Sequence, residues 1–247
     1  MKVTVLGCLG GFPHNDEGTS AYLLQEGSYN LLLDCGSRAV TELEHFVSPL
    51  CLDAVILSHY HHDHIADLGV LQYYRQLWDK DDWDGMNLSI YGHTEDKNRF
   101  NDLTLPNVST GVAYNPDETL RLGPFDVTFM KTIHPVPCYA MRFTVRKTGK
   151  VFVFTGDSGY MEEFKGFAKN ADLFLADTYL FEGQERHHAH FTSKESGEIA
   201  RVAQVKKLVL THLPQEKDLN LLHKQAQQAA GEKVTVELAK KRKTFEI

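Results

Sequence analysis

A dense histidine cluster near the start of the chain constrains the fold more than any other feature of the sequence. Residues 58–64 read SHYHHDH, the pattern H-x-H-x-D-H formed by His59, His61, Asp63 and His64. The cluster follows an apolar run at 53–58 that predicts a buried strand, and it precedes helical periodicity over 66–78. Neutral imidazole and carboxylate groups are good ligands for zinc and similar ions. The alternative, a solvated histidine-rich loop, is weak, because so many rings would crowd and charge at lower pH.

The remaining pattern predicts one α/β domain over residues 1–247, with two halves that each begin with hairpins and continue with helix–strand units. We expect strands at 2–7, 19–27, 29–36, 53–58, 88–92, 125–134, 140–149, 150–159, 173–180, 206–213 and weakly at 234–247. We expect helices at 39–47, 66–78, 193–204 with Ser193 as N-cap, and 218–230. Glycine-rich residues 10–18 form a loop. Two such halves predict two facing sheets with helices outside, a four-layer αββα sandwich.

The segment SHYHHDHIADL resembles the signature of the metallo-β-lactamase superfamily. This resemblance implies further ligands at strand ends, which match His134 in KTIHPV, Asp157 in FTGDSG and His212 in LVLTHL. It implies that one metal binds His59, His61 and His134, that a second binds Asp63, His64 and His212, and that Asp157 bridges both. The ions would be two divalent metals, Zn²⁺ in the first place, with Mn²⁺ or iron as alternatives. They would act through a bridging hydroxide that Asp63 orients. Ser58 and Asp177 are candidates to orient the ligands, although Asp177 could equally cap the next segment.

A second motif, HFTSKESGEIA at 190–200, resembles the ribonuclease Z subgroup, in which a histidine before the helix assists phosphodiester cleavage. His190 matches that position, with His188 as the rival and a solvated loop histidine as the other alternative. That subgroup usually inserts a basic arm for tRNA between the third motif and the bridging aspartate. Here His134 and Asp157 are only 23 positions apart, and the net charge is −7, which argues against tRNA.

The resemblance therefore predicts a phosphodiesterase for a small nucleotide-type substrate. Two alternatives stay open: an ester or thioester hydrolase of the lactonase or glyoxalase II type, and a binding protein that holds metal without turnover. Relatives of the ribonuclease Z group tend to dimerise, so a homodimer is expected, and Tyr73, Tyr74 and Trp78 are either interface or core residues.

The cysteines, the basic run and the N-terminus carry simpler expectations. Cys8, Cys35, Cys51 and Cys138 contain no C-x-x-C pair and are expected to be buried, with Cys138 near His134. The basic run at 240–243 is expected to be a solvated face. No run approaches the length of a membrane span, and the N-terminus is typical of a strand, so we expect a cytoplasmic protein without membrane contact.

Overall fold

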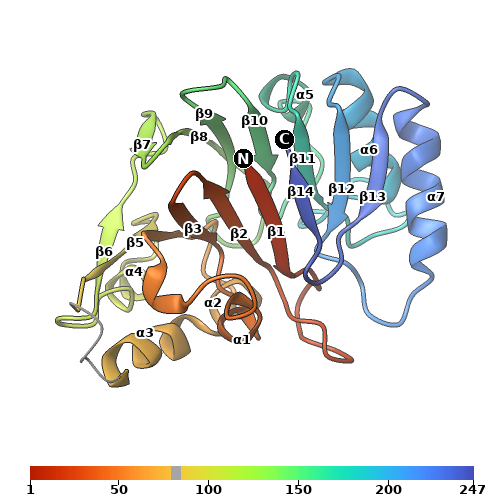
Figure 1. Cartoon of the computed structure of the whole chain (residues 1–247). Coiled ribbons are helices and arrows are strands. Elements are labelled where there is room, and N and C mark those ends of the chain that lie inside the picture. Colours follow the sequence, from red (N-terminus) through yellow and green to blue (C-terminus); the bar gives the residue numbers. More distant parts are fainter. Residues whose placement is uncertain (79–84) are drawn as a thin grey trace. The chain divides into compact units, whose positions relative to one another are not determined.

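The computed structural model describes residues 1–78 and 85–247, and the chain divides into two compact units. Unit 1 comprises Met1–Asn115 and Lys241–Glu246, and unit 2 comprises Pro116–Lys240 with Ile247. Each unit contains one seven-stranded sheet (Figure 1). The sequence thus predicts the number of sheets correctly, whereas the single-domain organisation over 1–247 stays a prediction.

The sheet of unit 1 has the strand order β14-β1-β2-β3-β4-β5-β6. Its strands are β1 (Lys2–Gly7), β2 (Ala21–Glu26), β3 (Tyr29–Leu33), β4 (Ala54–Ile56), β5 (Leu88–Gly92), β6 (Ser109–Ala113) and β14 (Thr244–Glu246). Its helices are α1 (Ala39–Leu43), the 3-10 helix η1 (Pro49–Cys51), α2 (His62–Ile65), α3 (Leu68–Leu77) and α4 (Lys97–Asn101). The strands from β14 to β3 pair antiparallel, and those from β3 to β6 pair parallel. The carboxyl ends of β3 to β6 therefore lie at one edge.

Apolar side chains of α1 and α3 cover one face of this sheet. Val40 and Leu43 of α1 and Leu71 of α3 share a buried cluster with Leu32 and Val55 of the strands. Burying such side chains contributes roughly 1.5–3 kcal/mol each, so this contact fixes the helices against the sheet.

The sheet of unit 2 has the order β13-β12-β11-β10-β9-β8-β7. Its strands are β7 (Leu120–Leu122), β8 (Phe125–Lys131), β9 (Tyr139–Val145), β10 (Val151–Phe154), β11 (Leu173–Asp177), β12 (Lys207–Thr211) and β13 (Thr235–Leu238). Its helices are α5 (Phe164–Phe167), α6 (Ser193–Val202) and α7 (Leu219–Ala230). The strands from β7 to β10 pair antiparallel and those from β10 to β13 pair parallel. Strands β8 and β10 to β13 consequently point the same way.

Three expectations about the elements are wrong in detail. The N-cap of α6 is Thr192 and not Ser193, because the Thr192 backbone is extended and its side chain accepts from the Glu195 N–H. The expected helix at 39–47 ends at Leu43. The expected strand at 234–247 is two strands, β13 in unit 2 and β14 beside β1 in unit 1, because residues 239–243 leave one sheet before β14 joins the other (Figure 1).

The basic run is not a freely solvated face. Arg242 Nε donates to Glu42 Oε2 at 2.6 Å, and Lys241 Nζ lies 3.7 Å from Glu42 Oε1. Burial would raise the pKa of Glu42, but these two cations outweigh it and hold the pKa below its ordinary value. The run therefore ties the C-terminal segment to α1 of unit 1.

Within the described ranges, no helix has both the length and the apolar character that crossing a membrane requires.

Candidate metal centre

In unit 1, the histidine cluster begins at the carboxyl edge of the parallel strands. Strand β4 ends at Ile56, His59 follows it, and Asp63 and His64 lie in the first turn of α2. Asp34 follows the neighbouring strand β3 and has a φ of 55°, so the chain turns sharply there. A left-handed residue other than glycine is uncommon and often marks a functional site. The fold thus gathers these side chains at a single edge of the sheet.

The buried carboxylate of Asp34 organises this cluster. Asp34 accepts from the Ser58 N–H at 2.7 Å, from Ser58 Oγ at 2.8 Å and from His64 Nδ1 at 2.7 Å. The only hydroxyl proton of Ser58 is used in this way, so His59 Nδ1 donates to Ser58 Oγ over 3.0 Å. Both rings therefore carry their N–H at Nδ1, and in the neutral form the lone pair is on Nε2.

The other residues of the motif have distinct environments. Asp63 is 9% exposed, and its Oδ2 accepts from the Gly11 N–H at 2.7 Å, which attaches the 10–18 loop to the cluster. His61 is half-buried, with its ring 4.9 Å from that of His59. His62 is exposed, as expected for a position between ligands. Tyr60 faces away from the rings, since its hydroxyl donates to the His93 carbonyl at 2.6 Å.

In unit 2, the remaining predicted ligands follow strands that point the same way. His134 follows β8, Asp157 follows β10 and His212 follows β12, while Asp177 is the last residue of β11. Asp157 Oδ2 lies 3.2 Å from His212 Nε2 and 3.9 Å from His134 Nε2. His212 has a φ of 52°, a strained turn directly after its strand. The structure therefore brings these three predicted ligands together within unit 2.

In unit 2, His134 also uses its Nδ1 for a hydrogen bond. His134 Nδ1 donates to the Ala189 carbonyl at 3.3 Å, and His212 Nδ1 lies 3.4 Å from Asp177 Oδ1. In both rings Nε2 is the nitrogen on the side of Asp157. Metal-binding histidines typically use one ring nitrogen for such a hydrogen bond and the other for the ion. The donor set of each unit, imidazole Nε2 with carboxylate oxygen, therefore fits a divalent ion such as Zn²⁺.

His190 lies beside this cluster and is held by Asp177. His190 Nδ1 donates to Asp177 Oδ2 at 2.8 Å, and its ring stacks on that of His212 with centroids 5.0 Å apart. Burial lowers the pKa of His190, but the Asp177 carboxylate outweighs it, so the pKa lies above its ordinary value. Asp177 also accepts from the Ser158 N–H at 3.1 Å. The carboxylate therefore orients His190 rather than capping the next segment.

The neighbouring histidines, His187 and His188, have different environments. His188 is exposed, and the half-buried His187 stacks on His190 with centroids 5.9 Å apart. Partial burial and the neighbouring imidazoles of His188 and His190 lower the pKa of His187. This placement favours His190 over His188.

Sequence reasoning missed Asp34 and Tyr179. Asp34 ends the apolar run YNLLLD, which is the same signal that indicates Asp157 and His212. The Tyr179 ring lies 5.3 Å from that of His190 and 5.8 Å from that of His212. No sequence signal separates Tyr179 from other aromatic residues.

The cysteines fit the expectation with one exception. Cys8, Cys35 and Cys138 are buried, whereas Cys51 is exposed. Burial raises the pKa of the Cys8 and Cys35 thiols. Cys138 is near Asp157 through the backbone, because the Thr132 hydroxyl reaches both of their carbonyls.

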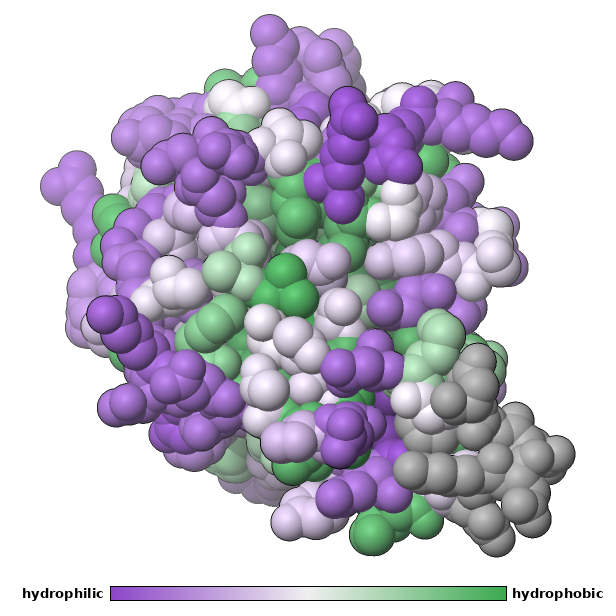
Figure 2. All heavy atoms as spheres, turned by 90° about the vertical axis from the view of Figure 1, so that its left-hand side faces the viewer, coloured by the Kyte–Doolittle hydropathy of each residue, from purple (hydrophilic) through white to green (hydrophobic). Residues whose placement is uncertain are grey.

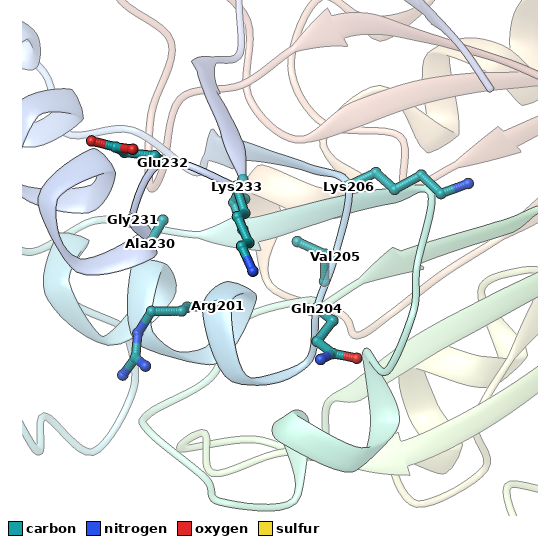
Figure 3. Close-up of a pocket in the computed structure, with 9 residues that line it drawn as sticks. Arg201, Gln204, Val205, Lys206, Ala230, Gly231, Glu232 and Lys233 are labelled. Atoms are coloured by element: carbon teal, nitrogen blue, oxygen red, sulfur yellow. The ribbon is translucent and has the colours of Figure 1, made fainter.

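A separate hollow of about 710 Å³ lies at the other end of β12, where α6 and α7 end (Figure 3). Lys206 precedes β12 and lines this hollow, whereas His212 follows β12 at the opposite edge. Arg201 Nε donates to the Ala229 carbonyl at 3.2 Å, and Lys206 pairs with Asp172. Cations are favoured at the C-terminal ends of helices. Because none of the predicted ligands lines it, this hollow does not belong to the metal centre.

Comparison with known proteins agrees with this geometry. A family model described as a beta-lactamase superfamily domain matches residues 29–213. The probable metallo-hydrolase YhfI of Bacillus subtilis is 48% identical over 215 residues, 87% of each chain. The crystal structure of B. subtilis YhfI has a TM-score of 0.93 and 44% identity, covering 99% of each chain.

The chain also has more distant similarities in sequence and in structure. Ribonuclease Z of Methanopyrus kandleri is 24% identical over 263 residues, covering 92% of each chain. The short form of human tRNase Z has a TM-score of 0.77 at 21% identity, covering 100% of this chain and 99% of the other. The predicted superfamily and its α/β sandwich are thereby confirmed. The chain belongs to the β-lactamase superfamily, has the metallo-β-lactamase fold and is a metallo-hydrolase.

Proposed function

We propose that this metallo-hydrolase is a phosphodiesterase that acts on a small, nucleotide-type substrate. The observation that carries the proposal is the pair of His190 and Asp177 beside His212. Breaking a phosphodiester leaves a charged oxygen, and an imidazole that a carboxylate holds in place can donate a proton to it or stabilise its charge. A distant relative is named ribonuclease Z, which adds support.

Seven residues would hold two divalent ions in this enzyme. His59, His61 and His134 would bind one, Asp63, His64 and His212 the other, and Asp157 both. Zn²⁺ suits these ligands best, with Mn²⁺ or iron as alternatives. When bound, such ions lower the pKa of water and neutralise charge on the phosphoryl oxygens.

The chain's own residues would then orient the metal ligands and protonate the leaving oxygen. Asp34 and Ser58 fix the rings of His59 and His64, and Gly11 fixes the Asp63 carboxylate. His190 is held by Asp177 with Nδ1 as donor, so Nε2 is the atom that would serve the leaving oxygen.

The connection between His134 and Asp157 favours a small substrate over tRNA. Strands β9 and β10, together with the turn at 146–150 that joins them, account for most of this interval. A protruding basic arm has no place in this interval. Electrostatic steering of a long polyanion is also disfavoured by the net charge of −7.

The test measures bound metal and bis(p-nitrophenyl) phosphate hydrolysis on the wild type, Asp63→Ala and His190→Ala. We expect two metals per wild-type chain, loss of metal and turnover in Asp63→Ala, and a fall in kcat of about 100-fold in His190→Ala with metal retained. Two metals without phosphodiester turnover, together with ester or thioester hydrolysis, would replace the proposal by the second hydrolase class. Metal without turnover of any of these substrates would favour a binding protein.

A further inference from the structure

The loop at 181–191, between β11 and α6, has its two ends fastened together. The Leu180 N–H donates to the Phe191 carbonyl at 3.1 Å, and the Ser193 N–H donates to the Leu180 carbonyl at 2.8 Å. Phe191 is fully buried, with its ring 5.1 Å from that of Phe164. His190 is therefore next to a fixed residue on its C-terminal side.

A single buried carboxylate, that of Glu195, binds this loop at two points. Glu195 is 4% exposed. Its Oε1 accepts from the Arg186 N–H at 3.0 Å, and its Oε2 accepts from the Thr192 N–H at 2.9 Å and from Thr192 Oγ1 at 3.0 Å. The two backbone donors flank residues 187–191, so Glu195 spans the segment that contains His190.

The contact with Arg186 goes beyond helix capping. A capping box needs only the reciprocal bonds between Thr192 and Glu195, which are present. Arg186 has a φ of 63°, a left-handed conformation that is unfavourable for an L-residue. A charge-assisted hydrogen bond from its N–H to a buried carboxylate offsets such a cost. The second oxygen of Glu195 thus stabilises the loop in this conformation.

We propose that Glu195 is a positioning residue for His190. By fixing the backbone at Arg186 and Thr192, it keeps His190 Nδ1 at 2.8 Å from Asp177 Oδ2 and the ring stacked on His212. The effect on turnover rests on the proposed function, whereas the effect on the His190 ring does not.

The variant Glu195→Gln tests this with little change of volume. An amide has one acceptor oxygen, and its NH₂ group must face either the Arg186 N–H or the two Thr192 donors. One end of the loop is therefore released. Thr192→Ala is the matched control, because it removes the hydroxyl of the cap and leaves both backbone N–H contacts of Glu195. Glu198→Gln, one turn further along α6 and half-buried, controls for the loss of charge.

The first readout is structural and uses the metal-loaded enzyme. Amide hydrogen exchange over 185–192 and the ring resonances of His190 are compared among the four proteins. We expect faster exchange and a displaced or broadened His190 resonance in Glu195→Gln, and wild-type behaviour at His190 in Thr192→Ala and Glu198→Gln. An unchanged His190 resonance in Glu195→Gln overturns the proposal, and so does an equal change in Thr192→Ala.

The second readout is the kcat and KM for bis(p-nitrophenyl) phosphate. We expect kcat to fall about tenfold in Glu195→Gln, with KM and bound metal unchanged, because small misplacements of a reacting group cost rates of this order. A wild-type kcat in Glu195→Gln overturns the proposal. If the wild type itself does not turn over phosphodiesters, the proposed function fails, and the His190 resonance alone decides the role of Glu195.

Discussion

At the residue scale, buried carboxylates decide which atom each histidine presents. Asp34 in unit 1 and Asp177 in unit 2 each accept from an imidazole Nδ1 at 2.7–2.8 Å. The sequence could indicate which residue types gather near the strand ends. The choice of tautomer depends on these hydrogen bonds, which pair residues 13 to 30 positions apart in the chain.

Asp34→Asn is expected to weaken metal binding about 10- to 100-fold, as is typical when a partner of a ligating histidine is changed. The amide NH₂ would replace Oδ2, which now accepts from Ser58 Oγ and His64 Nδ1. Zn²⁺ affinity is measured by competition with a chelator. Asp53→Asn is the control, since Asp53 accepts from the Asn30 N–H at 2.7 Å in a solvent-exposed hydrogen bond. Equal affinity of Asp34→Asn and wild type would refute this role.

Asp172→Asn is expected to lower the free energy of unfolding by about 1 kcal/mol at pH 7. Burial raises the pKa of Asp172, but hydrogen bonds from Lys206, the Val151 N–H and Lys150 outweigh it, so the pKa lies below its ordinary value. Because the folded-state pKa is depressed, this stabilisation is present above the unfolded pKa of about 4 and is lost as the pH falls through the folded pKa.

The measurement is urea unfolding of wild type and Asp172→Asn at pH 7 and pH 3. The difference should be clear at pH 7 and shrink at pH 3. Asp126→Asn, which removes a more exposed pair with Arg146, should change stability less. A difference that does not depend on pH would mean that the ion pairs of Asp172 do not stabilise unit 2.

At the element scale, α6 and α7 of unit 2 pack closely against each other. A Cβ added at Gly197 would lie 2.3 Å from the Ala226 carbonyl oxygen and 2.8 Å from the Ala229 Cβ. The sequence predicts both helices from their periodicity. Nothing in that periodicity indicates that Gly197 lies where the two backbones approach each other.

Gly197→Ala is consequently expected to destabilise the protein by about 1–3 kcal/mol, because the α7 backbone must move to admit a methyl group. Gly166→Ala is the matched control, since a Cβ there meets nothing within 4 Å. In that helical position alanine should stabilise by roughly 0.5–1 kcal/mol. Denaturant unfolding midpoints check both changes. A neutral Gly197→Ala would show that the helices separate at little cost.

At the scale of the whole molecule, α3 presents apolar side chains that are exposed among the described residues of unit 1. Val70 is 53% exposed, Tyr73 62%, Leu77 76% and Trp78 46%. Figure 2 shows one side of the molecule, on which hydrophobic residues (green) reach the surface. Of the three aromatics, Tyr74 packs partly on the core, whereas Tyr73 and Trp78 do not, so core packing does not explain their presence.

We expect this face of α3 to lie in a homodimer interface, since exposed apolar patches commonly mark association sites. Leu77→Lys should therefore shift the protein towards the monomer, as measured by size exclusion with light scattering. Leu221→Lys on α7, where the leucine is 43% exposed, is the control and should leave the molar mass in solution as in the wild type. A wild type that is monomeric at high concentration would contradict the expectation.

The sequence by itself determined the superfamily, the two sheets and most of the elements, because hydrophobic periodicity and the H-x-H-x-D-H motif are local signals. The tertiary structure alone decided the partners of each ligand. Asp34 meets His64 because β3 and β4 are parallel neighbours, and Glu195 meets Arg186 because the 181–191 loop closes on α6. It also decided that β14 pairs with β1, although most of the chain lies between these two strands in the sequence. Such contacts depend on which strands and loops become neighbours, and sequence spacing carries no direct record of that.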